Sequence, residues 1–146
     1  MTVQDESLIG RPEIPPIRML LADDSDVIRR VLFVFLEDEP LIEIVGEAKD
    51  FTELLEKALA LKPRIVLMDL HMRDKYKFKP EFVGSELQAS AQHVLAMSRS
   101  YNDKAVGLSN SYGASLLLDK NKLINELVPT VEKLARSQWG EHARIS

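Results

Sequence analysis

Short apolar runs alternate with longer amphipathic stretches along the chain from residue 17 onward. Five such runs lie at residues 17–22, 41–48, 64–69, 93–98 and 115–120. Runs of this length are typical of strands that are covered on both faces of a parallel sheet. In the stretches between several of them, apolar residues recur at spacings of three and four, which indicates helices. We therefore predict an α/β domain with a parallel sheet, helices on both faces and right-handed crossovers.

The stretch after the first strand has the clearest helical pattern. It begins at Ser25, with Asp24 or Ser25 as its N-cap, and Pro40 ends it. Its expected apolar face consists of Val27, Ile28, Val31, Leu32, Phe35 and Leu36. We expect this broad face to pack on the sheet.

Two other helices are predicted from the same periodicity. One spans residues 51–61, with Asp50 or Thr52 as its cap. The last spans residues 121–137 and contains Pro129, which should kink the helix or mark a break in it.

Two segments fit the pattern poorly. Residues 73–92 open with four lysines or arginines among seven residues, followed by Pro80 and Gly84. Only residues 81–91 could be helical, so we expect a loop with at most a short helix. Residues 102–112 are rich in weak helix formers and predict a helix of marginal stability.

Composition limits the class of protein. A chain of 146 residues with 45% hydrophobic and 29% charged residues fits one globular domain. The chain has no cysteine, which excludes disulfides and thiolate chemistry, and its net charge of -4 gives no electrostatic case for nucleic acid. Because no signal pattern or membrane-length apolar run is present, we predict a cytoplasmic protein without a membrane partner.

Carboxylates, a hydroxyl and an ammonium stand where the predicted strands end. In chain order they are Asp23, Asp24, Asp69, Ser98, Asp119 and Lys120. Parallel strands end at one edge of the sheet, where open α/β sheets bind ligands. Carboxylates in close quarters repel one another, and a divalent cation with oxygen ligands, such as Mg²⁺, would relieve that repulsion. An aspartate held there could accept a phosphoryl group as a nucleophile.

Each of these residues has an ordinary alternative when it is taken alone. The acidic pair could be a helix cap, Asp69 could start a turn, Ser98 could be a turn residue and Lys120 a solvated charge. Their order and shared position at strand ends favour the chemical interpretation.

Four stretches, LLADDSDVIRRVL, VLMDLHM, HVLAMS and GASLLLDK, together resemble the receiver domain of two-component response regulators. The resemblance covers about residues 17–136 and is closest to receivers of regulators that usually carry a LuxR-type helix-turn-helix. It implies a flavodoxin-like, CheY-like sheet of five parallel strands in the order 2-1-3-4-5, with the third helix short or replaced by a loop. We predict a flexible leader at residues 1–16, a receiver domain at 17–137 and a C-terminal tail at 138–146.

The resemblance implies a role for each residue at the strand ends. Asp69 would be the phosphoacceptor and would also be one of the Mg²⁺ ligands. Asp23 and Asp24 would hold Mg²⁺, with Asp24 the more direct ligand, and the backbone carbonyl of His71 would complete the protein ligands.

The remaining roles concern the response to phosphorylation. Ser98 would be the switch hydroxyl that turns toward the phosphoryl group, and Lys120 would pair with that group. Leu117 occupies the switch position where the family usually has an aromatic residue.

Other departures from the family pattern lie beside these positions. Arg73 and Asn121 stand where prolines are usual, and Arg99 stands where a small residue is usual. A lysine-rich segment replaces the usual start of the third helix. The basic residues at 73, 75, 77 and 79 could belong to a solvated loop or form a docking patch for an acidic partner or nucleic acid.

We therefore predict a stand-alone receiver in two-component phosphorelay signalling, not a conventional enzyme. A sensor histidine kinase would donate the phosphoryl group and an unknown output protein would receive the signal, with a homodimer as a further option. Nucleic acid is not an expected partner, since we expect no output domain. The alternative is a phosphorylation-independent scaffold, which Leu117 and the altered 73–92 segment favour and the intact acidic positions disfavour. A haloacid-dehalogenase-like phosphatase would need an aspartate at the position of His71.

Overall fold

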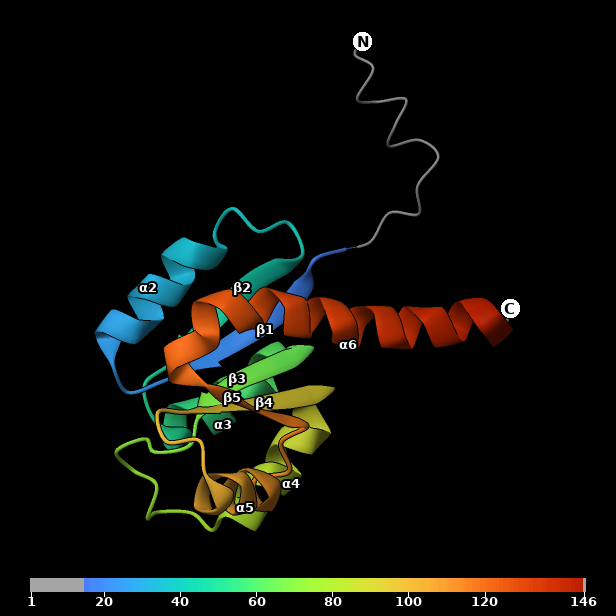
Figure 1. Cartoon of the computed structure of the whole chain (residues 1–146). Coiled ribbons are helices and arrows are strands. Elements are labelled where there is room, and N and C mark those ends of the chain that lie inside the picture. The colour runs from blue at the N-terminus through green and yellow to red at the C-terminus, as the bar shows by residue number, and fades with distance from the viewer. Residues whose placement is uncertain (1–14, 146) are drawn as a thin grey trace.

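A five-stranded parallel sheet forms the centre of the domain (Figure 1). The structure is a computed structural model that describes residues 15–145, with side chains as far as residue 137. The strands are β1 (Ile17–Ala22), β2 (Ile42–Ala48), β3 (Ile65–Asp69), β4 (His93–Ser98) and β5 (Leu116–Asp119). Their order, β2-β1-β3-β4-β5, confirms the predicted flavodoxin-like arrangement.

Helices cover both faces of this sheet (Figure 1). They are α2 (Asp26–Leu36), α3 (Phe51–Leu61), α4 (Pro80–Ser90), α5 (Asp103–Ser111) and α6 (Leu123–Ile145), which a 3₁₀ turn at Lys120–Lys122 precedes. Helices α2 and α6 pack on one face, and α3, α4 and α5 pack on the other. Within the described residues, no helix is long and apolar enough to span a membrane.

Strand β1 shows how the side chains divide between the two layers. Met19 and Leu21 pack with α2 and α6, whereas Leu20 and Ala22 pack with α3 and α4. All four side chains are fully buried. A strand with both faces covered has few solvent-facing positions, and the partly buried Arg18 near the start of β1 is the one polar residue in this otherwise apolar run.

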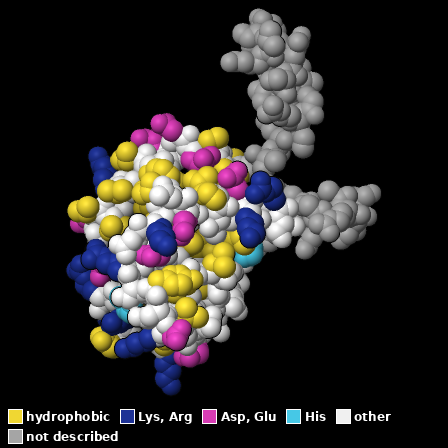
Figure 2. Space-filling model, viewed as in Figure 1, with side chains coloured by type: hydrophobic (Ala, Val, Ile, Leu, Met, Phe, Trp, Pro, Cys, Tyr) yellow, Lys and Arg dark blue, Asp and Glu magenta, His cyan; other side chains and the backbone are white. Residues whose placement is uncertain are grey.

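The apolar face predicted for α2 is wider than the face that the sheet covers. Leu32 and Leu36 are buried, as predicted, and Ile28 is partly buried. The other predicted members, Val27, Val31 and Phe35, are exposed. The prediction was wrong for these three because α2 contacts the sheet along one side only. Figure 2 shows hydrophobic side chains on the surface over this helix.

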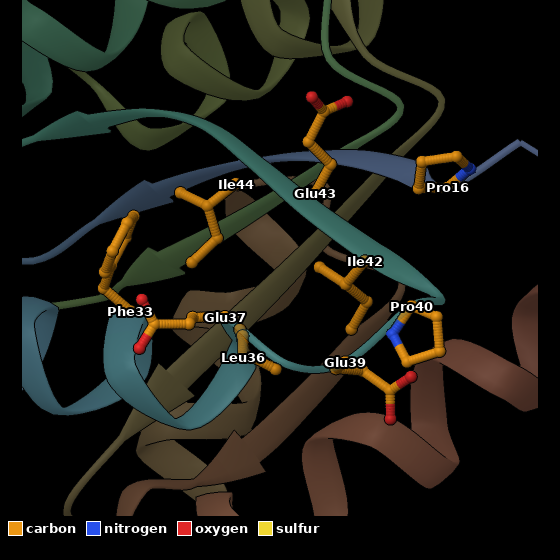
Figure 3. A pocket seen from close by; sticks show the side chains of 9 residues that line it. All are labelled: Pro16, Phe33, Leu36, Glu37, Glu39, Pro40, Ile42, Glu43 and Ile44. Carbon is orange, nitrogen blue, oxygen red and sulfur yellow. The ribbon is translucent and has the colours of Figure 1, made fainter.

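A hollow of about 430 Å³ lies where α2 meets the edge strand β2 (Figure 3). Phe33 and Leu36 of α2 lie beside Ile42 and Ile44 of β2 along it. Three glutamates also line the hollow, namely Glu37, Glu39 and Glu43. The exposed apolar surface on this side of the molecule is therefore bordered by negative charge.

The poorly patterned segment after β3 contains more helix than its sequence suggested. Residues 73–79 form turns, but α4 has eleven residues, the same length as α2 and α3. It begins at Pro80, where the fixed backbone of proline suits the first turn of a helix. Only Val83, Gly84 and Leu87 of this helix are buried, which explains its poor apolar periodicity.

Helices α4 and α5 approach each other closely at Gly84. A Cβ atom at Gly84 would lie 2.6 Å from the carbonyl oxygen of Tyr112, so the contact requires glycine. The buried ring of Tyr112 stacks on Phe51 of α3, with 5.3 Å between the ring centroids. Burial raises the pKa of Tyr112 to about 12. Helix α5 is capped by Asn102, and Gly113 follows it with a φ of +72°.

The last helix is longer than its sequence pattern predicted. Helix α6 passes through Pro129 as one element, so the proline marks no break, and its backbone continues beyond residue 137 to Ile145. The side chains of the predicted tail, 138–146, and residues 1–14 of the predicted leader lie outside the described residues. The division into leader, receiver domain and tail stays a prediction.

Candidate functional site

The side chains predicted at the strand ends meet in one pocket. This strand-end pocket, of about 290 Å³, is lined by Asp23, Asp24, Ser25, Asp69, His71, Ser98, Arg99, Ser100 and Lys120. Of the residues predicted for the site, Leu117 and the strand-end Asp119 do not line it. Leu117 is half-buried and packs against the core layer under α3, α4 and α5.

The parallel register of the sheet explains why these residues converge. The final pairs bring Ala22 beside Met68, Asp69 beside Met97, and Ser98 beside Asp119. The strands thus end nearly level, and the residues that follow each strand lie around a common edge. The side chain of Ser25 caps α2 by accepting from the backbone N–H of Ile28 at 3.2 Å.

Asp23 and Lys120 form a buried ion pair. The Lys120 ammonium lies 2.6 Å from Oδ2 of Asp23, and Asp23 is fully buried. Oδ1 of Asp23 accepts a hydrogen bond from the N–H of Ser25 at 2.9 Å. Oδ2 has no aligned hydrogen-bond donor among the described residues. A buried carboxylate is costly to desolvate, so the lysine provides the compensating charge.

Asp69, the last residue of β3, is less tightly paired. Its Oδ2 lies 3.4 Å from the Lys120 ammonium, and its Oδ1 accepts from the N–H of His71 at 3.1 Å. Burial raises the pKa of the Asp69 carboxyl, and the charges of Asp23 and Asp24 add to this effect. Lys120 and the His71 N–H act in the opposite direction without cancelling it. Asp69 is thus a carboxylate whose negative charge is only partly compensated.

Three carboxylates in this pocket could hold a metal ion. Asp23, Asp24 and Asp69 each present an oxygen atom, and these atoms lie within 4.8 Å of one another. Oxygen donors suit Mg²⁺ or Ca²⁺ rather than softer metals. The raised pKa of Asp69 is a feature that a bound cation would relieve. The residues present therefore fit a hard divalent cation.

The hydroxyl of Ser98 is engaged in a local turn. It donates to the carbonyl oxygen of Ser100 at 3.0 Å and accepts from the N–H of Ser100 at 3.2 Å. The side chain of Asn121 reaches the same loop and donates to the carbonyl of Arg99 at 3.4 Å. The loop after β4 is thus tied both to itself and to the start of α6.

Sequence analysis missed the role of Asp74. Asp74 lies in the segment after β3. Its carboxylate accepts hydrogen bonds from the N–H of Phe51 at 2.7 Å and from the N–H of Thr52 at 3.0 Å. It also accepts from the Thr52 hydroxyl at 2.7 Å, while Asp50 caps the N–H of Glu53 at 2.8 Å. Asp74 therefore fastens this segment to the start of α3. No local sequence pattern links Asp74 to Phe51, 23 residues earlier in the chain, so this contact could not be predicted.

The fold and the pocket together define a doubly wound flavodoxin-like domain with a carboxylate cluster and a lysine at the carboxyl edge of its sheet. Among solved structures, the receiver domain of NarL from Mycobacterium tuberculosis has a TM-score of 0.73 and 23% identity, covering 84% of this chain and 98% of that chain. The response regulator domain of Thermotoga maritima CheB has a TM-score of 0.69 and 25% identity, covering 81% of this chain and 95% of that chain. No family model matches the chain.

Curated relatives point to the same family. A protein-glutamate methylesterase/protein-glutamine glutaminase of Myxococcus xanthus is 31% identical over 129 residues, which are 86% of this chain and 34% of the relative. The transcriptional regulatory protein LiaR of Bacillus subtilis is 48% identical over 56 residues, which are 38% of this chain and 26% of the relative. The chain thus spans about a third or less of the length of these relatives. The domain is a response regulator receiver domain, as the sequence resemblance predicted.

Proposed function

We propose that Asp69 accepts a phosphoryl group from a sensor histidine kinase, so that the domain acts in two-component phosphorelay signalling. The observation that carries the proposal is the setting of Asp69. Its carboxylate lies in an open pocket, within reach of a buried lysine and beside two further carboxylates. Phosphoryl transfer needs a nucleophile together with positive charge at the transferring group, and this pocket supplies both.

The chemistry divides among the residues of the strand-end pocket. An oxygen of the ionised Asp69 carboxylate forms the new bond to phosphorus as the bond to the donor histidine breaks. Lys120 neutralises charge on the phosphoryl oxygens. Asp23, Asp24 and the backbone carbonyl of His71 would hold Mg²⁺, which supplies a second positive charge when bound.

The raised pKa of Asp69 has a consequence for this reaction. Only the ionised carboxylate is a nucleophile, so protonation of Asp69 in acid removes the acceptor. Phosphoryl acceptance should therefore decline in acid, and bound Mg²⁺, which favours the ionised carboxylate, should move that decline to lower pH.

Ser98 is proposed as the switch hydroxyl. To reach a phosphoryl oxygen it would release the carbonyl of Ser100 and exchange a neutral hydrogen bond for a charge-assisted one. That exchange would rearrange the loop that leads into α5. Leu117 lacks the ring of the usual switch residue, so we expect the packing change at this position to be small.

The proposal extends to partners and scope. The domain would signal in the cytoplasm by binding an output protein, and not as an enzyme. Named relatives include methylesterases and a transcriptional regulator, each much longer than the matched region. Their activities are therefore not carried over to this chain.

Intact mass spectrometry after incubation with acetyl phosphate tests the proposal. We expect a single phosphoryl adduct that requires Mg²⁺ and is lost in Asp69→Asn. Asp119→Asn is the matched control, because Asp119 ends strand β5 of the same sheet but does not line the pocket. A folded protein that forms no adduct would overturn the proposal.

The second candidate is a phosphorylation-independent scaffold. The observation that favours it is the segment after β3, where exposed lysines replace the usual start of the third helix. The two functions separate cleanly, because a scaffold would bind its partner equally well before and after treatment with acetyl phosphate.

A further inference from the structure

A second pocket lies next to the strand-end pocket, between the segment after β3 and helix α5. This basic groove has a volume of about 640 Å³ and is lined by Lys75, Lys77, Lys79 and Lys104. In Figure 2, Lys and Arg side chains gather at the lower left of the visible face, where Figure 1 draws the connection from β3 to α4. The groove is thus a local concentration of positive charge on a chain whose net charge is -4.

None of these four lysines forms an ion pair with a carboxylate of the described residues. Lys75 lies over the ring of Tyr76, with 5.2 Å from its ammonium to the ring centroid. By contrast, lysines outside the groove such as Lys49 and Lys57 pair with Glu53. The groove therefore presents cations that are free to pair with a ligand of opposite charge.

Two of the lysines stand at helix N-termini. Lys79 is the N-cap residue of α4, which has no side-chain cap, and Lys104 lies in the first turn of α5. A helix N-terminus carries partial positive charge, so a cation there is unfavourable for stability. The lysines and the two helix ends together concentrate positive potential in the groove. This placement is costly for the fold and favourable for an incoming carboxylate.

The rest of the groove is largely apolar. Leu70, Leu108 and the buried Tyr112 contribute to its lining, as does the half-buried Phe78. Tyr76 lies at its border with 89% of its surface exposed. A ligand that satisfies this surface needs an apolar or aromatic side chain as well as negative charge.

We propose that the basic groove binds an acidic segment of a partner protein, with its carboxylates at Lys79 and Lys104 and an apolar side chain among Leu108 and Tyr112. A nucleic acid fits less well. Exposed Glu81 and Asp103 follow closely on the two lysines in sequence and would repel an extended phosphate backbone. A short acidic segment avoids this repulsion because its charges can be confined to the groove.

The groove touches the strand-end pocket but does not depend on it. His71 lines both pockets, so the bound segment would lie close to Asp69. The proposal goes beyond phosphoryl acceptance and concerns the unmodified protein. If the groove binds no acidic segment, the proposed phosphorylation of Asp69 is unaffected. If Asp69 accepts no phosphoryl group, the proposed binding in the groove is unaffected.

The test uses the unphosphorylated chain and the synthetic peptide EDFEDL, with binding followed by fluorescence anisotropy and by amide NMR shifts. We expect shifts confined to residues 70–80 and 103–112, which include the lining of the groove. Combined Lys77→Ser and Lys79→Ser should weaken binding about fivefold. The matched control changes the exposed residues Lys122 and Lys133 to serine and should alter affinity by less than about twofold.

Further probes separate charge from apolar contact. The neutral peptide QNFQNL and the polar peptide EDSEDS should each bind more weakly than EDFEDL. Absence of EDFEDL binding, or equal losses in the two double variants, would overturn the proposal. Tighter binding of a short oligothymidylate than of EDFEDL would overturn it in favour of nucleic acid.

Discussion

Two segments that follow each other directly along the chain are held in place in different ways. At the end of β3, Asp69 is buried beside the ion pair of Asp23 and Lys120. A few residues later, the lysines of the basic groove face solvent, and a single carboxylate, that of Asp74, fastens the segment to α3. The strand end is held by buried charges, whereas the segment after it is held by the Asp74 carboxylate, the buried Met72 and the half-buried Phe78.

This difference indicates which positions of the domain tolerate substitution. Charges at the strand ends are desolvated, so each needs a partner at a fixed distance and a substitution leaves another charge unpaired. The lysine side chains of the groove form no ion pair with the described residues, so these positions can change without loss of the fold. This contrast fits phosphoryl chemistry at the strand-end pocket and partner recognition at the basic groove beside it.

The largest effect should come from Lys120→Met. Removing the ammonium leaves Asp23 as a buried, unpaired carboxylate, and breaking such a pair costs about 3 kcal/mol. The domain should still fold, with a lower free energy of unfolding in urea, and Mg²⁺ should restore part of the loss if the carboxylates bind it. The exposed control Lys133→Met should change stability by less than about 0.5 kcal/mol. Equal effects of the two substitutions would mean that the strand-end pocket is no more constrained than the surface.

A pair of glycines tests how firmly α4 is seated behind the basic groove. Gly84→Ala places a methyl group against the carbonyl of Tyr112 and should destabilise the domain by about 2 kcal/mol. Gly107→Ala in α5 meets nothing within 4 Å and should instead stabilise it by about 0.5 kcal/mol or more. Urea unfolding of both variants gives the sign of each change in the free energy of unfolding. Two changes of the same sign would contradict the close approach of α4 and α5.

The smallest effect concerns Asp74. Asp74→Ala removes the acceptor for the first N–H groups of α3 and should cost about 1 kcal/mol at neutral pH. Burial alone would raise the pKa of Asp74, but the hydrogen bonds from Phe51 and Thr52 outweigh it and the net pKa is lowered. The carboxylate therefore stabilises the fold above its unfolded-state pKa, and this contribution is lost as the pH falls through the lower, folded-state pKa.

The measurement for Asp74 is the free energy of unfolding at neutral and at acid pH. The difference between wild type and Asp74→Ala should shrink in acid, whereas the exposed control Asp38→Ala should show little effect at either pH. If the difference in free energy of unfolding between wild type and Asp74→Ala does not change with pH, the stabilising role of Asp74 depends on packing and not on its charge.

The sheet and the strand-end residues could be predicted because their signals are local. A doubly covered strand must be an apolar run, and a charge at its end must lie at the open edge of the sheet. The positions of Asp23, Asp69, Ser98 and Lys120 in one pocket follow from these two rules. The roles assigned to these four residues rest on the family resemblance.

The remaining features depend on contacts that a sequence pattern does not encode. The exposure of Val31 depends on how much of α2 the sheet covers. The need for glycine at position 84 depends on the close approach of the end of α5. Asp74 caps a helix that precedes it in the chain, so a search for caps next to each helix cannot find it. Helix α4 buries only a narrow stripe, which is too weak a signal for periodicity.

The central claim is that Asp69 is the phosphoacceptor, and chemical mapping of the modified residue tests it most directly. After reaction with acetyl phosphate and Mg²⁺, borohydride reduction converts an aspartyl phosphate to homoserine, and peptide mass spectrometry locates that conversion. We predict it at position 69 in the peptide that contains the end of β3. Conversion at Asp23, Asp24 or Asp119, or at no position, would contradict the account.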